Sequence, residues 1–121
     1  MKKFSIEFYE KDNRDIPVEN FLNSMDTKMR VKTVGLLQIL QEKGNFLREP
    51  YSKYLEDGIF ELRIKAGTNI SRLLYFFYYE GKIVVTNGFI KKTNKTPRSE
   101  IERAKRFKKE YLERVNNNEN T

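Results

Sequence analysis

Arginine, lysine, tyrosine and the two acids must supply any acid–base chemistry in this 121-residue chain, because it contains neither histidine nor cysteine. Without cysteine there are no disulfides, thiolate zinc sites or cysteine nucleophiles, and without histidine the usual general base and commonest metal ligand are missing. The remaining groups are compatible with cleavage of RNA by attack of a ribose 2′-hydroxyl on the adjacent phosphate. Arginine binds phosphate oxygens bidentately, and lysine adds a point charge or, with a depressed pKa, carries a proton.

Cationic residues recur on three successive predicted strands. Arg63 and Lys65 share one strand face, Arg72 opens the next strand, and Lys91 and Lys92 close the last one. In an antiparallel meander these positions could converge at one end of the sheet. They are therefore the candidate site.

Each candidate also has a structural interpretation. The first pair could be ordinary solvent-facing strand residues, Arg72 could pair with Glu61 across the strands, and the terminal lysines could solubilise a strand end. The aromatic run from Tyr75 to Tyr79 is more typical of a core strand, although either tyrosine would stack on a base if it were exposed. The residues alone indicate a basic domain with a cationic patch.

The net charge of +7 is concentrated in one segment, since residues 91–109 hold nine basic and only two acidic residues. Such a segment favours a polyanionic partner, with nucleic acid first and an acidic protein second, although a solvated lysine-rich helix face is an equally good interpretation. The candidate RNA- or ribosome-binding residues are Lys65, Lys95, Arg98, Arg103, Lys105, Arg106 and Lys109.

Length and composition indicate one domain, over residues 1–115, followed by a polar and disordered tail at 116–121. The chain is 38% hydrophobic and 34% charged, and no apolar run approaches the roughly 20 residues that span a bilayer. Its first residues do not resemble a signal peptide. We expect a cytoplasmic protein without membrane contact.

The apolar periodicity predicts the element order β-α-α-β-β-β-α and an α+β fold class. Period-2 alternation predicts strands at 3–8 and 60–65, and apolar runs predict a central strand at 73–79 and another from 83 to about 90. Helical spacing predicts a helix from Pro17, a second between an Asp26 cap and Gly44, and a third with Thr96 as N-cap and Pro97 as first residue.

Several short motifs resemble the phage-related HigB branch of the RelE/ParE toxin superfamily. They are, in chain order, the "ELR" strand at 60–63, the "R-x-x-Y-F" strand at 71–76, the "GF-x-KKT-x-KTP" junction at 88–97 and the helix start at 100–104. The order and spacing of the motifs are more specific than any one of them. The strong part of the resemblance covers residues 60–104, about half of the chain.

The resemblance implies the RelE fold, with a small antiparallel sheet between an N-terminal helical hairpin and a C-terminal helix. It also implies cleavage of mRNA in the ribosomal A site without metal or other cofactor. Arg63 and Arg72 match the family's strand arginines, which would stabilise the phosphate and the transition state. Lys91 and Lys92 match its terminal lysines, one of which would transfer the proton. Tyr111 lies well into the helix, so the general base stays unassigned.

The implied partners are the ribosome, mRNA and a small HigA-like antitoxin with a helix-turn-helix fold, through which alone the chain would contact operator DNA. Two other functions are compatible with the sequence. ParE-like members of the superfamily bind and inhibit DNA gyrase without cutting RNA. A decayed toxin would retain only antitoxin and operator binding.

Overall fold

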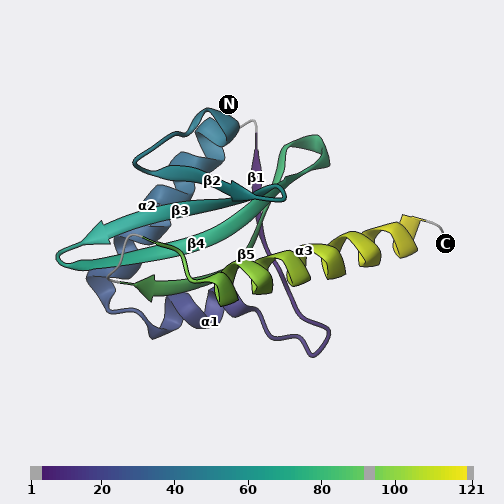
Figure 1. The fold of residues 1–121 in the computed structure, drawn as a ribbon, viewed down its shortest axis with the longest axis horizontal. Helices are drawn as coiled ribbons and strands as arrows, with labels where there is room; N and C mark the ends of the chain where they lie inside the picture. The colour runs from purple at the N-terminus through teal and green to yellow at the C-terminus, as the bar shows by residue number, and fades with distance from the viewer. Residues whose placement is uncertain (1–3, 92–94, 120–121) are drawn as a thin grey trace.

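The computed structural model describes residues 4–91 and 95–119 (Figure 1). Within them, five strands form one sheet in the order β1-β5-β4-β3-β2, accompanied by three α-helices. The strands are β1 (Ser5–Phe8), β2 (Ser52–Glu56), β3 (Ile59–Ala66), β4 (Asn69–Tyr78) and β5 (Lys82–Lys91). The helices are α1 (Pro17–Ser24), α2 (Thr27–Lys43) and α3 (Arg98–Glu119), and single 3₁₀ turns lie at Gly44–Phe46 and Tyr79–Gly81. The predicted α+β class is confirmed.

The sheet is mixed. Strands β2 to β5 form an antiparallel meander, as the short predicted turns require, but β1 pairs in parallel with β5. The two N-terminal helices carry the chain from β1 at one edge of the sheet to β2 at the other. A parallel pairing requires a long connection of this kind, because a tight hairpin can join only antiparallel strands.

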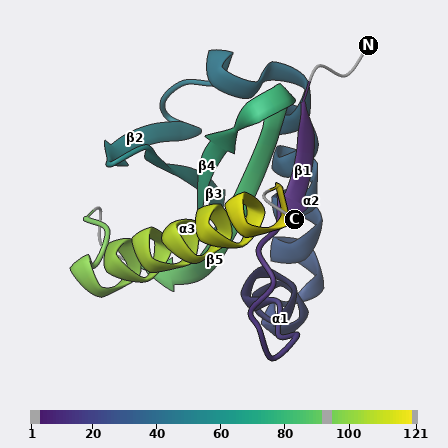
Figure 2. The ribbon, with the colours of Figure 1, turned by 90° about the vertical axis from the view of Figure 1, so that its right-hand side faces the viewer.

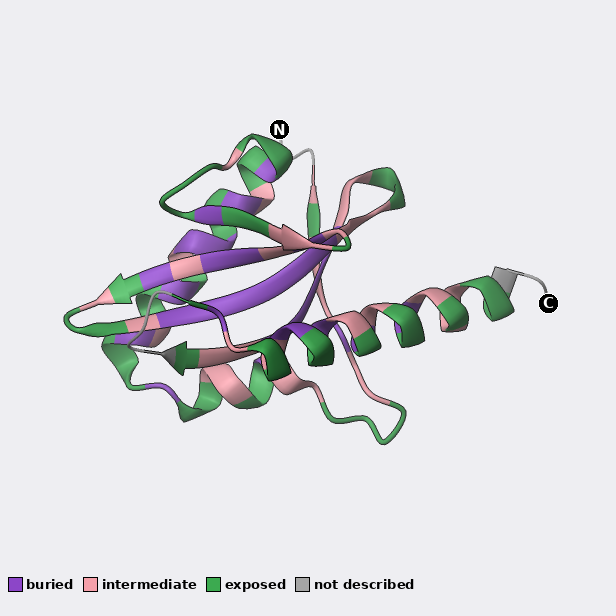
Figure 3. Ribbon diagram, in the orientation of Figure 1, coloured by how far each residue is buried: buried purple, intermediate pink, exposed green. Residues whose placement is uncertain are grey.

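The helices cover opposite faces of the sheet (Figure 2). On one face, Val18 of α1 and Leu37 and Leu40 of α2 pack with Leu62 and Leu73 of the sheet. On the other face, the apolar stripe of α3 packs on the sheet through Ala104, Phe107 and Tyr111. The central strand β4 is buried at every residue from 71 to 76 (Figure 3), which confirms the prediction of a strand covered on both sides.

The ends of α2 are those that its sequence predicts. The Asp26 carboxylate accepts a hydrogen bond from the Met29 amide at 2.8 Å, which caps the first turn. Gly44 follows the helix with φ of +52°, a conformation that costs a side chain more than it costs glycine. The Phe4 ring also lies where a Cβ of residue 44 would be, so both the backbone and the packing require glycine here.

Three sequence predictions need correction. Strand β2 lies where a loop was expected, because its residues alternate poorly and it is an edge strand that pairs only with β3 in the described sheet. Thr96 is not the N-cap of α3, since the helix begins at Arg98 and the Pro97 carbonyl accepts from the Ile101 amide. Helix α3 continues to Glu119, so residues 116–119 of the expected tail are helical. None of the described helices has the length and apolar character to cross a membrane.

Candidate functional site

The register of the sheet brings the predicted strand arginines together. Arg63 on β3 lies directly opposite Arg72 on β4, and Lys65 lies opposite Ile70. On the other side of β4, the backbone of Ile70 pairs with that of Lys91. Directly opposite residues of an antiparallel pair share a face, so both arginines belong to one face of the sheet. We call Arg63, Lys65, Arg72 and the backbone position of Lys91 the cationic end.

Arg72 is completely buried in the cationic end and is paired with a buried carboxylate. Its Nη1 lies 3.6 Å from Oε2 of Glu61, which is the cross-strand pair that the structural interpretation of the sequence proposed. Burial lowers the pKa of the Arg72 guanidinium, and the Glu61 charge opposes this shift. Arginine nevertheless stays charged in proteins, so the pair is a buried ion pair. In this structure Arg72 has no surface that a substrate could touch.

Glu61 connects three side chains. Its Oε2 accepts a hydrogen bond from the Thr96 hydroxyl, and its Oε1 lies 3.6 Å from Nε of Arg63. Arg72 Nη1 also donates to the Thr96 hydroxyl at 3.5 Å. The Thr96 side chain therefore ties the segment before α3 to β3 and β4, which explains why it does not cap the helix.

Arg63 is the strand arginine that solvent reaches, with 23% of its side chain exposed, and Lys65 beside it is exposed as well. Two like charges directly opposite one another destabilise a sheet. Glu61 lies within ion-pair distance of both arginines and offsets their repulsion. The result is an accessible guanidinium, held on a rigid strand by a buried carboxylate, that can bind a phosphate oxygen from the solvent side.

The predicted terminal lysines are only partly placed. Lys91 is the last residue of β5, and its backbone position belongs to the cationic end. Lys92 lies outside the described residues. Lys95 is exposed just before Thr96.

Part of the predicted RNA-binding surface on α3 is engaged in ion pairs within the chain. Arg98 pairs with Glu56 and Glu102, and Lys105 lies 3.0 Å from Glu56 and 2.8 Å from Asp57. Hydrogen bonds from Arg98 and Lys105 lower the pKa of Glu56 to about 2. The bonds to Glu56 and Glu102 raise the pKa of Arg98, and those to Asp57 and Glu56 raise the pKa of Lys105. These pairs fasten the first turns of α3 to the β2–β3 hairpin.

The remaining predicted cations on α3 differ in their surroundings. Arg103 lies 3.7 Å from Glu100, whereas Arg106 and Lys109 are exposed on the outer surface of the helix. Arg106 also lies over the Phe107 ring, 5.2 Å from its centroid.

Neither tyrosine that might stack on a base lies near the cationic end. Tyr75 is buried and its hydroxyl bonds that of Ser52, so it is a core residue as its run predicts. Tyr79 is exposed, but it follows the far end of β4, seven residues beyond Arg72 and therefore about 23 Å away along an extended strand.

Two residues of the site were not identified as functional from the sequence. Glu61 was considered only as a pairing partner, and Thr96 only as a helix cap. The sequence signal for Glu61 is a carboxylate on the same strand face as Arg63 and within reach of Arg72 on the next strand. The burial of Glu61, however, depends on the segment before α3, which covers it. That cover is a tertiary contact between residues 35 positions apart.

Comparison with known proteins supports the assignment of the fold. A family model described as "Phage derived protein Gp49-like" matches residues 20–109. Among solved structures, the fold is similar to that of an archaeal RelE–RelB complex from Pyrococcus horikoshii OT3, with a TM-score of 0.50 and 13% identity. The similarity covers 77% of this chain and 99% of the archaeal chain. No curated protein matches the chain.

Proposed function

This chain belongs to the Gp49-like family of phage-derived proteins, and we propose that it is the toxin of a toxin–antitoxin pair that cuts messenger RNA on the ribosome. The family is one of RelE/HigB-type toxins, and the sheet with its flanking helices has the RelE fold. The observation that carries the proposal is the cationic end, where the accessible Arg63 lies opposite the buried Arg72.

The side chains of the cationic end would have different roles in this reaction. Arg63 would bind the scissile phosphate and stabilise the charge that grows on it. Arg72 would act through Glu61, as a positioning residue that holds Arg63 in place. Lys91 or Lys92 would transfer the proton, a role that rests on the match to the family's motif.

The proposed reaction needs no metal ion, because the nucleophile is part of the RNA and cationic side chains neutralise the phosphate. The 2′-hydroxyl gives its proton to a base and its oxygen bonds to phosphorus. The bond from phosphorus to the 5′-oxygen breaks, the 5′-oxygen takes up a proton, and a 2′,3′-cyclic phosphate results. Exposed cations such as Lys65, Lys95, Arg106 and Lys109 would dock on ribosomal RNA through its phosphates. An antitoxin with a helix-turn-helix fold and an acidic segment would neutralise the toxin in the cytoplasm.

A cell-free translation reaction with a defined mRNA tests the proposal. Primer extension, with and without ribosomes and with a chelator present, maps new 5′ ends. We expect cuts that require ribosomes, persist in the chelator and fall by about 100-fold or more in Arg63→Ala. Lys53→Ala is the matched control, because Lys53 is an exposed cation on the neighbouring strand β2. Its activity should equal that of the wild type.

Other outcomes would assign a different function. An intact message together with growth arrest on expression would direct attention to DNA gyrase, for which a supercoiling assay with purified gyrase is decisive. An intact message without growth arrest would leave only antitoxin binding. Cuts that appear equally without ribosomes would contradict ribosome dependence but not nuclease activity.

A further inference from the structure

Helix α2 carries a line of exposed residues on the side that is turned away from the core. Its inner side is buried through Met29, Leu37 and Leu40. The helical repeat of 3.6 residues places a second line of residues on the outer side. In chain order this line, which we call the outer stripe, consists of Lys28, Val31, Lys32, Gly35, Gln38, Ile39 and Glu42. All of its members are exposed except Gly35, which is half-buried.

The outer stripe is arranged symmetrically about Gly35. Val31 and Ile39 each lie four positions from Gly35, and Lys28 and Glu42 each lie seven positions from it. A second α2 that runs in the opposite direction and crosses at Gly35 therefore places valine against isoleucine and lysine against glutamate. Each contact occurs twice, because residue i of one copy meets residue j of the other and the reverse in a two-fold pair. The outer stripe is thus complementary to itself.

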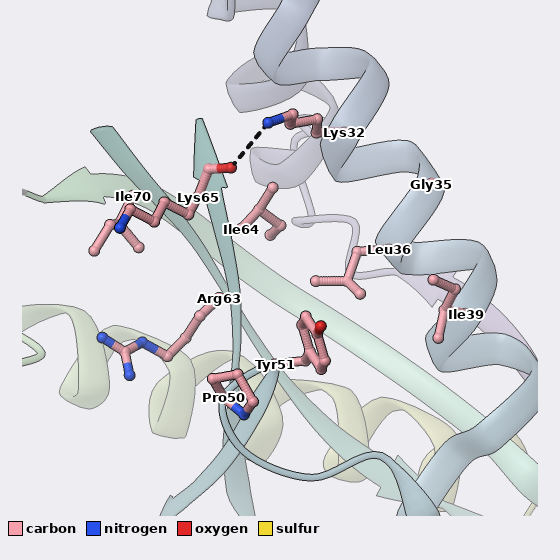
Figure 4. A pocket seen from close by; sticks show the side chains of 10 residues that line it. All are labelled: Lys32, Gly35, Leu36, Ile39, Pro50, Tyr51, Arg63, Ile64, Lys65 and Ile70. Carbon is pink, nitrogen blue, oxygen red and sulfur yellow. Dashed lines mark hydrogen bonds between the residues drawn. The ribbon is translucent and has the colours of Figure 1, made fainter. Parts of the chain in front are cut away.

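The apolar residues of the outer stripe are exposed although the helix already buries its other side. Val31 is 66% exposed and Ile39 is 42% exposed. Ile39, Gly35 and Lys32 also line an open groove of about 720 Å³ between α2 and β3 (Figure 4). In the antiparallel pair, Val31 of one copy would lie against Ile39 of the other at the rim of this groove. Both side chains would leave water, which is the main favourable contribution to association.

Gly35 lies at the centre of the outer stripe, where two helices packed in this way approach most closely. Its backbone is helical, and a Cβ there would meet nothing within 4 Å beyond its chain neighbours and the helix backbone. The fold of a single copy therefore does not require glycine at this position, although glycine weakens a helix interior relative to alanine. The missing side chain permits a second helix to pack close to the backbone. This close approach would bring the flanking pairs into contact.

The charges of the outer stripe favour an antiparallel pair of identical helices. Lys28 and Glu42 are both exposed, and neither has an ion-pair partner within the described part of its own chain. A parallel pair would place each charge against its own copy, whereas the antiparallel pair joins opposite charges at both ends. The net charge of +7 does not oppose this contact. The excess lies in residues 91–109, most of which belong to α3 on the opposite face of the sheet.

We propose that a second copy of this chain binds the outer stripe of α2, as an antiparallel two-fold dimer centred on Gly35. Because one pair of helices forms a small interface, the dissociation constant should be about 10–100 µM. Sedimentation equilibrium of the full chain, from about 10 µM to about 1 mM, measures this constant.

Two kinds of variant test the arrangement. Gly35→Leu should weaken the dimer by about 10-fold or more, because its side chain would hold the two helices apart. Lys28→Glu and Glu42→Lys should each weaken it by about 10-fold, since each places like charges together twice. The double variant Lys28→Glu/Glu42→Lys should restore the dimer. The two positions are about 21 Å apart along one helix, so this rescue can arise only between two copies.

Lys53→Glu, on strand β2 outside the outer stripe, is the matched control and should dimerise as the wild type does. Circular dichroism and melting temperature check that each variant folds, and the charge variants decide alone if Gly35→Leu does not. A monomer at about 1 mM would overturn the proposal and leave α2 to a different protein. A dimer that Gly35→Leu or either charge reversal leaves unchanged would overturn it as well, as would a double variant that stays monomeric. The assay contains no RNA, so its result does not depend on the proposed nuclease function.

Discussion

Arg63 and Arg72 are equivalent in the sequence pattern, but their different surroundings beside Glu61 give them different properties. The carboxylate is buried within ion-pair distance of both guanidiniums, but Arg72 is enclosed with it whereas Arg63 extends to solvent. Removing one partner of a buried pair leaves an uncompensated charge, and this is costly. Removing a partly exposed partner is less costly because water can replace it.

Arg72→Ala should therefore destabilise the protein far more than Arg63→Ala. We expect a loss of about 3–5 kcal/mol in the free energy of unfolding for Arg72→Ala and of about 1 kcal/mol for Arg63→Ala. Urea denaturation followed by circular dichroism measures both, provided that the slope with denaturant is unchanged. Equal losses would show that Glu61 does not distinguish the two arginines as the structure indicates.

The sequence could name the arginines of the site but could not assign them separate roles. Period-2 spacing places Arg63 and Glu61 on one face of β3, and this was correct. Two features decide whether Arg72 contacts a phosphate or Glu61, and neither can be predicted from the local sequence. One is the register of β3 and β4, and the other is the cover supplied by Thr96.

At the scale of elements, the attachment of α3 to the β2–β3 hairpin depends on surface charge. Glu56 accepts hydrogen bonds from Arg98 and Lys105, and these hold its pKa near 2 instead of the ordinary 4.5. A carboxylate whose pKa is lower in the folded state stabilises that state above its unfolded pKa. The stabilisation is lost as the pH falls from about 4.5 to about 2.

Glu56→Gln should consequently flatten the fall in melting temperature between pH 4.5 and pH 2. The variant should have a lower melting temperature than the wild type at pH 7, and the difference in melting temperature should shrink toward pH 2. Salt at about 1 M should also reduce this difference, because these groups are accessible to solvent. Thermal melts across this pH range test the prediction. A difference between the two proteins that does not change with pH would contradict it.

Gly35 allows a prediction about α2 that does not depend on any partner. Gly35→Ala should raise the free energy of unfolding by about 0.5–1 kcal/mol, because alanine loses less backbone entropy in a helix and the site has room for its methyl group. Chemical denaturation of the two proteins gives the difference. A destabilised Gly35→Ala protein would mean that the space beside α2 is filled in solution.

The elements that the sequence predicted well are those with strong local signals. Asp26 and Gly44 bound α2 through a cap and a positive φ, both of which are properties of the residues themselves. Strand β2 was missed because only its pairing with β3 makes it a strand. The parallel pairing of β1 with β5 was beyond reach for a similar reason, since the partners are distant in sequence.

For the molecule as a whole, ion pairs within the chain neutralise part of the positive charge that the sequence concentrates in residues 91–109. Arg98 and Lys105 are engaged with acids of the β2–β3 hairpin and of α3 itself, whereas Arg106 and Lys109 face outward. Only cations that contact phosphates release counterions on binding. The proposed ribosome-binding surface should therefore include fewer cations than the sequence suggests.

Salt dependence can distinguish these cations. In ribosome binding, the slope of log K against log salt should become shallower by about 1 in Arg106→Ala and in Lys109→Ala. Arg98→Ala and Lys105→Ala should change it much less, because those side chains already have partners. Sedimentation with ribosomes at several salt concentrations measures the slope. The same change in all four variants would mean that the intramolecular pairs open on binding.

The pairing of the chain's two end regions has a consequence for when this protein can fold. β1 finds its partner β5 more than 70 positions later, and Tyr9 donates a hydrogen bond to Glu110 of α3, 101 positions away. Ribosomes make the amino end first, so β1 must wait for nearly the whole chain before its neighbours exist. The helix that covers the second face emerges last. A toxin built in this way would acquire its active form only after α3 has been synthesised.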